Sequence, residues 1–169
     1  MNYAAIKKFD IANGPGVRVS LFVSGCRHKC KNCFNSEAWD FSYGNPFTDA
    51  VLQELLDALN KDHIEGFSLL GGEPFEPENQ ECVRDILKAI KQKYPQKTVW
   101  CYTGFLYDTQ LLAGTVGDKQ TVCEILENID VLVDGKFVEE LKRLDLLFRG
   151  SSNQRIIDVK RSRQKGTTI

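Results

Sequence analysis

The feature of this sequence that most constrains the chain is a group of three closely spaced cysteines, Cys26, Cys30 and Cys33. They follow an apolar run, residues 19–23, which is typical of a buried strand. Three thiolates on one short loop can hold a soft metal centre. Most cubane iron–sulfur clusters take four cysteines, and no fourth lies nearby, so one iron would keep an open coordination position.

Positive charges alternate with these cysteines, at Arg27, Lys29 and Lys31. Nearby cations stabilise thiolates and offset the negative charge of a thiolate-bound cluster. Three alternatives stay open. The cysteines could lie on one helix face, although the charges and Gly25 suit a loop better. They could bind zinc with His28 as the fourth ligand, or form a disulfide that leaves one cysteine over.

The length of 169 residues indicates one domain. We expect it to span residues 1–159 and to be followed by a disordered, basic and polar tail at 160–169. A net charge of −1 gives no nucleic-acid or membrane signature, and no apolar run reaches membrane-spanning length. The N-terminus has no signal-peptide core. We therefore expect a cytoplasmic protein without nucleic-acid or membrane partners, in which the count of six cysteines points to metal or redox chemistry rather than to disulfides.

Predicted strands and helices alternate along the chain, with connections long enough for parallel crossovers. This order predicts an α/β fold with a mainly parallel sheet. A complete eight-stranded barrel typically needs about 250 residues, so we expect a partial βα barrel. The predicted strands are 19–23, 66–70, 98–102, 131–133 and 155–159; the predicted helices are 48–61, 79–93 and 119–128, with weaker helical signals at 108–112 and 139–144.

Each unusual polar cluster directly follows a predicted strand. After the cysteine loop come Gly71-Gly72-Glu73, Thr103-Gly104 and Asp134-Gly135-Lys136. In βα barrels and open α/β sheets, chemistry gathers at the carboxyl ends of the strands. We therefore expect these four stretches to converge on one site.

The C-x₃-C-x₂-C spacing resembles the signature of the radical S-adenosylmethionine (radical SAM) enzymes. Residues 13–18 and 21–26 together resemble the activating proteins of glycyl-radical enzymes. Two later stretches, 131–137 and 149–154, resemble the proteins that activate anaerobic ribonucleoside-triphosphate reductase. The resemblance covers about residues 10–154 of the chain.

This resemblance implies that Cys26, Cys30 and Cys33 are the catalytic cysteines and hold a [4Fe-4S] cluster. It also implies that S-adenosylmethionine binds the fourth iron through its amino and carboxylate groups. At Asn32 the family usually has an aromatic residue, which leaves the adenine contact to the backbone there. The residues implied to bind the cofactor are Asn32, Phe34, Gly71, Gly72, Glu73, Thr103, Asp134 and Lys136.

Separate roles follow for these residues. Glycines at 71 and 72 let a ligand approach the backbone without interference from a Cβ, while the Glu73 carboxylate could accept hydrogen bonds from the amino group. Phe34 would pack beside the adenine or the cluster. Thr103 and Asp134 would meet the ribose or the methionyl carboxylate, and Lys136 suits the carboxylate.

The implied activity is that of an oxidoreductase that cleaves S-adenosylmethionine reductively and forms a glycyl radical on anaerobic ribonucleoside-triphosphate reductase. The implied partners are this reductase and an electron donor such as flavodoxin. Two other functions are weighed against it. One is a small radical SAM enzyme acting on a small molecule such as a deazapurine. The other is a zinc or iron–sulfur binding adaptor or electron carrier.

Overall fold

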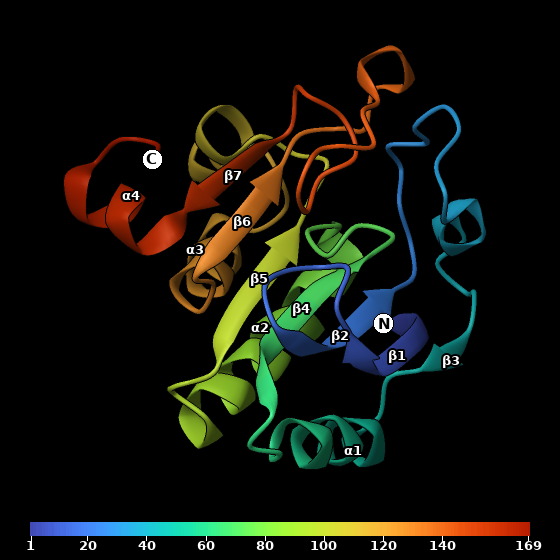
Figure 1. Cartoon of the computed structure of the whole chain (residues 1–169), viewed down its shortest axis with the longest axis vertical. Helices are drawn as coiled ribbons and strands as arrows, with labels where there is room; N and C mark the ends of the chain where they lie inside the picture. Colours follow the sequence, from blue (N-terminus) through green and yellow to red (C-terminus); the bar gives the residue numbers. More distant parts are fainter.

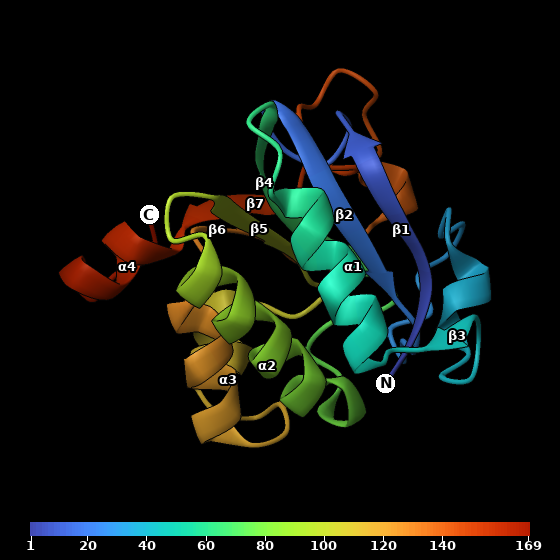
Figure 2. The same ribbon diagram turned by 90° about the horizontal axis from the view of Figure 1, so that it is seen from below.

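The computed structural model describes residues 1–169, which form one seven-stranded sheet with helices α1, α2 and α3 on one face (Figures 1 and 2). The strand order is β3-β1-β2-β4-β5-β6-β7. The strands are β1 (Asn2–Asp10), β2 (Val17–Val23), β3 (Asn45–Pro46), β4 (Ile64–Gly71), β5 (Thr98–Tyr102), β6 (Val131–Asp134) and β7 (Arg155–Asp158). The helices are η1 (Ser36–Trp39), α1 (Asp49–Leu59), α2 (Pro77–Lys93), η2 (Tyr107–Leu112), α3 (Lys119–Glu127), η3 (Glu139–Leu141) and α4 (Val159–Lys165).

The centre of the sheet is parallel, because β2, β4, β5 and β6 run in the same direction. Strands β1, β3 and β7 pair antiparallel with their neighbours, so the sheet as a whole is mixed. It is not closed, and its two edges are β3 and β7. The structure therefore confirms the predicted α/β class, with an open sheet.

The register of the parallel strands sets the position of their carboxyl ends. Val23 pairs with Gly71 across β2 and β4, and Tyr102 pairs with Val133 across β5 and β6. The loops that follow these strands consequently leave the sheet side by side. Figure 1 shows the segment after β6 lying next to the segment after β2.

Local sequence signals explain where the long helices begin. The Thr48 side chain caps α1 by accepting a hydrogen bond from Val51 N, and Asp118 caps α3 by accepting one from Thr121 N. Helix α2 begins with Pro77, whose fixed φ suits the first helical position. The apolar faces of these helices pack on the sheet and form the core, which includes Leu55, Leu59, Ile86, Ile90, Ile125 and Leu126.

Three parts of the structure differ from the sequence-based expectations. Strand β1 was missed, because it is a largely exposed strand with Lys7 and Lys8 and no regular apolar alternation. Residues 139–144 were expected to be helical, but only the short helix η3 forms. The tail 160–169 is not disordered: α4 spans most of it, and Asp158 N donates to Ile169 O at 2.7 Å.

No helix of the structure combines the length and the apolar character needed to cross a membrane.

A fully buried arginine joins β2 to β4 and β5. The five N–H groups of Arg18 donate to Ser68 Oγ, to Thr98 Oγ1, and to the carbonyl oxygens of Pro15, Phe67 and Thr98, at distances of 2.8–3.2 Å. Burial lowers the pKa of Arg18 to about 10, so the side chain stays charged at neutral pH. Its full set of donors satisfies carbonyl groups that would otherwise be buried without partners.

We expect Arg18→Met to lower the free energy of unfolding by about 3 kcal/mol, because it leaves buried carbonyls without donors. The measurement is chemical denaturation. Arg163→Met is the matched control, since Arg163 forms a surface ion pair with Glu127 at 3.0 Å. The control should change stability by about 0.5 kcal/mol or less. Equal effects of the two substitutions would contradict the role given to Arg18.

Candidate metal and cofactor site

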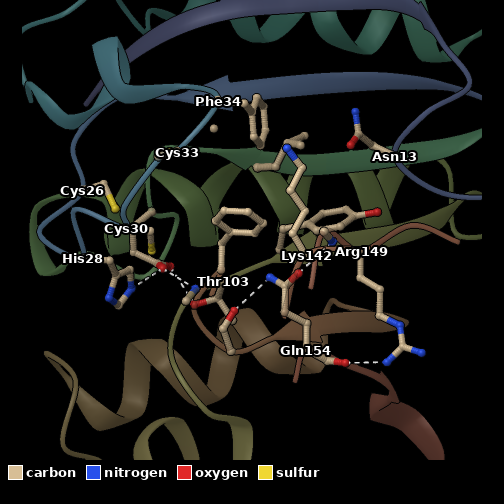
Figure 3. A pocket seen from close by; sticks show the side chains of 18 of the residues that line it. Asn13, Cys26, His28, Cys30, Cys33, Phe34, Thr103, Lys142, Arg149 and Gln154 are labelled. Carbon is tan, nitrogen blue, oxygen red and sulfur yellow. Dashed lines mark hydrogen bonds and ion pairs between the residues drawn. The ribbon is translucent and has the colours of Figure 1, made fainter. Parts of the chain in front are cut away.

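A cavity of about 460 Å³ lies at the carboxyl ends of the parallel strands (Figure 3). Its walls come from the cysteine loop, from the turn after β4, from the end of β5 and from residues 135–154. This volume lies within the range of about 300–1,000 Å³ found for small-molecule sites. The structure thus brings at least part of each predicted polar stretch to a single cavity.

All three cysteines of the loop line this cavity, with Cys26 buried and Cys30 and Cys33 partly exposed. The loop bends through left-handed backbone positions at Lys29 (φ 48°) and Asn32 (φ 56°). No three His, Cys, Asp or Glu side chains are gathered closely enough to hold one metal ion. A cluster of four irons binds each thiolate at a different metal atom, so three thiols facing one cavity fit a cluster.

Burial favours the protonated form of two of the thiols, those of Cys26 and Cys30. Burial raises the pKa of Cys26 to about 11, and the backbone N–H groups of His28 and Lys29 only partly oppose this effect. Burial also raises the pKa of Cys30, against the opposing effects of the Phe137 N–H group and the Lys136 ammonium. Metal binding at this loop therefore releases protons.

The two glycines of the turn after β4 are packed against protein backbone. Gly71 has a φ of 118°, and a Cβ there would lie 2.6 Å from Val23 O. A Cβ on Gly72 would lie 2.6 Å from Gly25 O and 2.8 Å from Ala38 O. The lack of a side chain lets the turn pack against β2 and the cysteine loop, and both glycines also line the cavity, so their role toward a ligand stays a prediction.

The Glu73 carboxylate is fully buried and accepts four hydrogen bonds from the protein. Phe75 N and Thr103 Oγ1 donate to Oε1 at 2.9 and 2.8 Å, while Gly104 N and His28 Nε2 contact Oε2 at 2.8 and 2.7 Å. A carboxylate offers about four acceptor positions, so the Glu73 side chain has none left for an amino group. Its predicted contact with the cofactor is therefore not supported by its placement.

Only 7% of the His28 side chain is accessible. Its ring lies between the cysteine loop and the end of β5, with its centre 4.4 Å from that of Phe105. The sequence contains no local signal for this burial, because both Glu73 and Phe105 are distant along the chain.

The other predicted residues divide into two groups. Asn32, Phe34 and Thr103 line the cavity, and Phe34 is 87% exposed at its mouth. Asp134 does not line it: its buried carboxylate accepts hydrogen bonds from Tyr107 N and from Arg155, which is a different set of partners from the predicted ligand. Lys136 is exposed outside the cavity wall. The placement of these last two residues does not support their predicted roles.

Residues 137–154 form much of the cavity wall, and the sequence analysis gave none of their side chains a role in the site. Lys142 forms no ion pair and extends among the side chains that line the cavity (Figure 3), so its ammonium is free to meet a carboxylate. Arg149 also lines the cavity and donates to Gln154 O at 2.7 Å. Phe148 packs edge-on against Trp100 on the sheet. The similarity of 149–154 to activating proteins was the only sequence signal for this region.

Comparison with known families agrees with an iron–sulfur site. Residues 12–157 match a family model described as a 4Fe-4S single cluster domain. This match covers the cysteine loop and every other wall of the cavity. The class of protein defined by the fold and the site is thus that of single-cluster iron–sulfur domains.

Curated relatives narrow the class. The chain is 41% identical over 156 residues to the anaerobic ribonucleoside-triphosphate reductase-activating protein of Escherichia coli K12, covering 91% of this chain and 96% of the relative. It is 39% identical to the protein of the same name from Enterobacteria phage T4, over 92% and 93% of the two chains. For the Haemophilus influenzae protein of that name the identity is 40%, over 91% and 96%. This chain belongs to the family of anaerobic ribonucleoside-triphosphate reductase-activating proteins.

The packing of Gly72 generates a prediction. Gly72→Ala should lower the free energy of unfolding by about 1–3 kcal/mol, because the new Cβ displaces the backbone of the cysteine loop. It should also lower iron uptake, whereas a contact with the ligand alone would spare iron uptake. Gly166→Ala is the control for iron uptake: nothing lies within 4 Å of a Cβ there, so only the strain of its left-handed backbone (φ 67°), about 1 kcal/mol, should appear, with normal iron content. Iron analysis and denaturation measure both effects; normal iron content in Gly72→Ala would refute the packing argument.

Proposed function

We propose that this protein is a radical SAM activase, an oxidoreductase that generates a glycyl radical on anaerobic ribonucleoside-triphosphate reductase. The observation that carries the proposal is the meeting of Cys26, Cys30 and Cys33 with the Gly71-Gly72 turn around one cavity. The names of its relatives support the choice of partner. The open α/β sheet is compatible with the partial barrel expected for radical SAM enzymes.

The three thiolates would hold a [4Fe-4S] cluster and leave one iron for the amino and carboxylate groups of S-adenosylmethionine. Such a cluster, bound and reduced, would supply the single electron needed for reductive cleavage of S-adenosylmethionine to methionine and a 5′-deoxyadenosyl radical. The chain's own residues orient the ligand. The backbone at Gly71 and Gly72 faces its amino group, and the free ammonium of Lys142 replaces Lys136 as the partner for its carboxylate.

The mouth of the cavity suits a protein substrate. Phe34 and Leu144 line the cavity and are 87% and 93% exposed, so apolar surface lies where a segment of a partner would enter. A glycine on that segment has no side chain to block its Cα. Misplacement of the Cα by 1 Å can lower the rate by about 10²-fold, so contacts at the mouth would contribute to catalysis.

Two features argue against the alternatives. For a zinc adaptor, the structure gathers no group of three His, Cys, Asp or Glu side chains, His28 included, around a single ion position. For an enzyme acting on a small molecule such as a deazapurine, 39–41% identity to reductase-activating proteins along nearly the whole chain is unexpected. An electron donor such as flavodoxin completes the proposal, because each cleavage consumes one electron.

Protein reconstituted without oxygen should bind about four irons per chain if it holds a single cubane. Cys26→Ala, Cys30→Ala and Cys33→Ala should each abolish this binding. Cys82→Ala is the control and should leave it intact, because Cys82 lies in α2 outside the cavity wall. Stoichiometric zinc in place of iron under the same conditions would reject the cluster.

Activation itself can be observed by electron paramagnetic resonance. Mixing the iron-loaded protein, a reductant, S-adenosylmethionine and the reductase without oxygen should produce an organic radical on the reductase. Deuterium placed at the glycine Cα should collapse the main hyperfine splitting and appear in 5′-deoxyadenosine. Formation of 5′-deoxyadenosine without a radical on the reductase would reject the reductase as the partner, but it would still support cleavage of S-adenosylmethionine.

A further inference from the structure

The buried Glu73 carboxylate lies directly behind the cysteine loop and uses its acceptor positions on groups of the protein. Its four hydrogen bonds join three separate segments: the turn after β4, the end of β5 and the cysteine loop. Only one of the four reaches the cysteine loop, and it ends on His28, two residues after Cys26. The fit is close, because a Cβ on Gly104 would lie 2.6 Å from His28 Nε2.

The first half of the cysteine loop, residues 23–27, is hydrogen-bonded to the turn between β4 and α2 and to the beginning of α2. Four further hydrogen bonds connect the two segments, from the end of β2 to the residue after Cys26. They join Gly72 N to Val23 O (2.7 Å), Asn79 Nδ2 to Ser24 O (3.0 Å), Glu73 N to Gly25 O (2.8 Å) and Arg27 N to Glu76 Oε1 (2.7 Å).

The second half of the loop is held differently. Between Lys29 and Cys33 the backbone forms one hydrogen bond, from Cys33 N to Cys30 O at 3.1 Å. Lys31 adds an exposed ion pair with Glu140 at 3.9 Å. The loop is therefore asymmetric: a row of hydrogen bonds holds the segment that carries Cys26, whereas Cys30 and Cys33 have fewer restraints, among them the Phe137 N–H group at the Cys30 thiol.

We propose that Glu73 is a positioning residue which, through His28, fixes Cys26 in its place before a cluster is bound. Cys30 and Cys33 then complete the ligand set from the less restrained half of the loop. The inference rests on the proposed function only in taking Cys26 as a cluster ligand. Its test uses the metal-free full-length chain, so it can fail while iron binding and activation by the wild-type protein succeed.

His28→Gln and His28→Asn form a matched pair for this test. The amide nitrogen of Gln can occupy the position of His Nε2, the atom that contacts Glu73, whereas the amide of Asn is one methylene too short. Both variants place the same chemical group in the same surroundings. They differ in whether the hydrogen bond to Glu73 can form.

The readout is the alkylation rate of individual cysteines by iodoacetamide, followed by mass spectrometry. Cys26 should react about tenfold faster or more in His28→Asn than in the wild type, because loss of a buried hydrogen bond to a charged group favours local opening. In His28→Gln it should react within about twofold of the wild type. Cys101, which is 0% exposed in β5, reports global unfolding and should stay protected in both variants.

Hydrogen exchange gives a measurement that does not depend on a thiol. The amides of Gly25 and Cys26 donate to Ala38 O and Trp39 O at 2.7 and 3.2 Å, and they should exchange faster in His28→Asn alone. Glu73→Gln should behave like His28→Asn. The NH₂ group of the Gln side chain would face a donor at a position where the Glu73 oxygen accepts a hydrogen bond. Equal Cys26 rates in the two His28 variants, or a parallel rise in Cys101 reactivity, would overturn the proposal.

Discussion

The parallel pairing of β2 with β4 is the constraint on which the rest of the site depends. Because Val23 pairs with Gly71, the cysteine loop and the glycine turn leave the sheet at the same level and in contact. Strands β5 and β6 continue the same direction and bring Thr103 and residues 135–154 to that edge. One register thus assembles a site from segments that are far apart in the sequence, such as Cys26 and Gln154, which are separated by 128 positions.

Close packing at this edge restricts which residues can stand there. Gly71 and Gly72 approach backbone atoms of β2 and of the cysteine loop, and Gly104 approaches the His28 ring. Polar groups buried by this packing need internal partners, and Glu73 supplies them with a single carboxylate. At the other end of the parallel strands, Arg18 plays the same part for carbonyl groups.

The two faces of the sheet serve different purposes. Helices α1, α2 and α3 cover one face and form the core with it (Figure 2). The cavity opens on the side of residues 137–154, which are anchored by Phe148 on Trp100 but present exposed side chains such as Leu144. A rigid core therefore supports a site with an accessible mouth.

The sequence by itself determined the features that depend on neighbouring residues. The spacing of Cys26, Cys30 and Cys33 predicted a loop with three thiols facing a common centre, and Thr48 and the apolar periodicity predicted α1. Alternation of strands and helices predicted the α/β class, and the family followed from motifs. Strand β1 and helix α4 were not predicted, because their short-range sequence patterns are weak and β1 pairs with strands that the sequence does not identify as its neighbours.

Only the tertiary structure decided where the polar side chains point. Glu73 turns toward His28, 45 residues away, and Asp134 toward Arg155, 21 residues away, so neither carboxylate is free for a ligand. Lys142, which sequence reasoning did not assign, lines the cavity instead of Lys136. Spacing along the chain cannot reveal these directions, since a buried charge is satisfied by whichever partner the packing of distant segments brings to it.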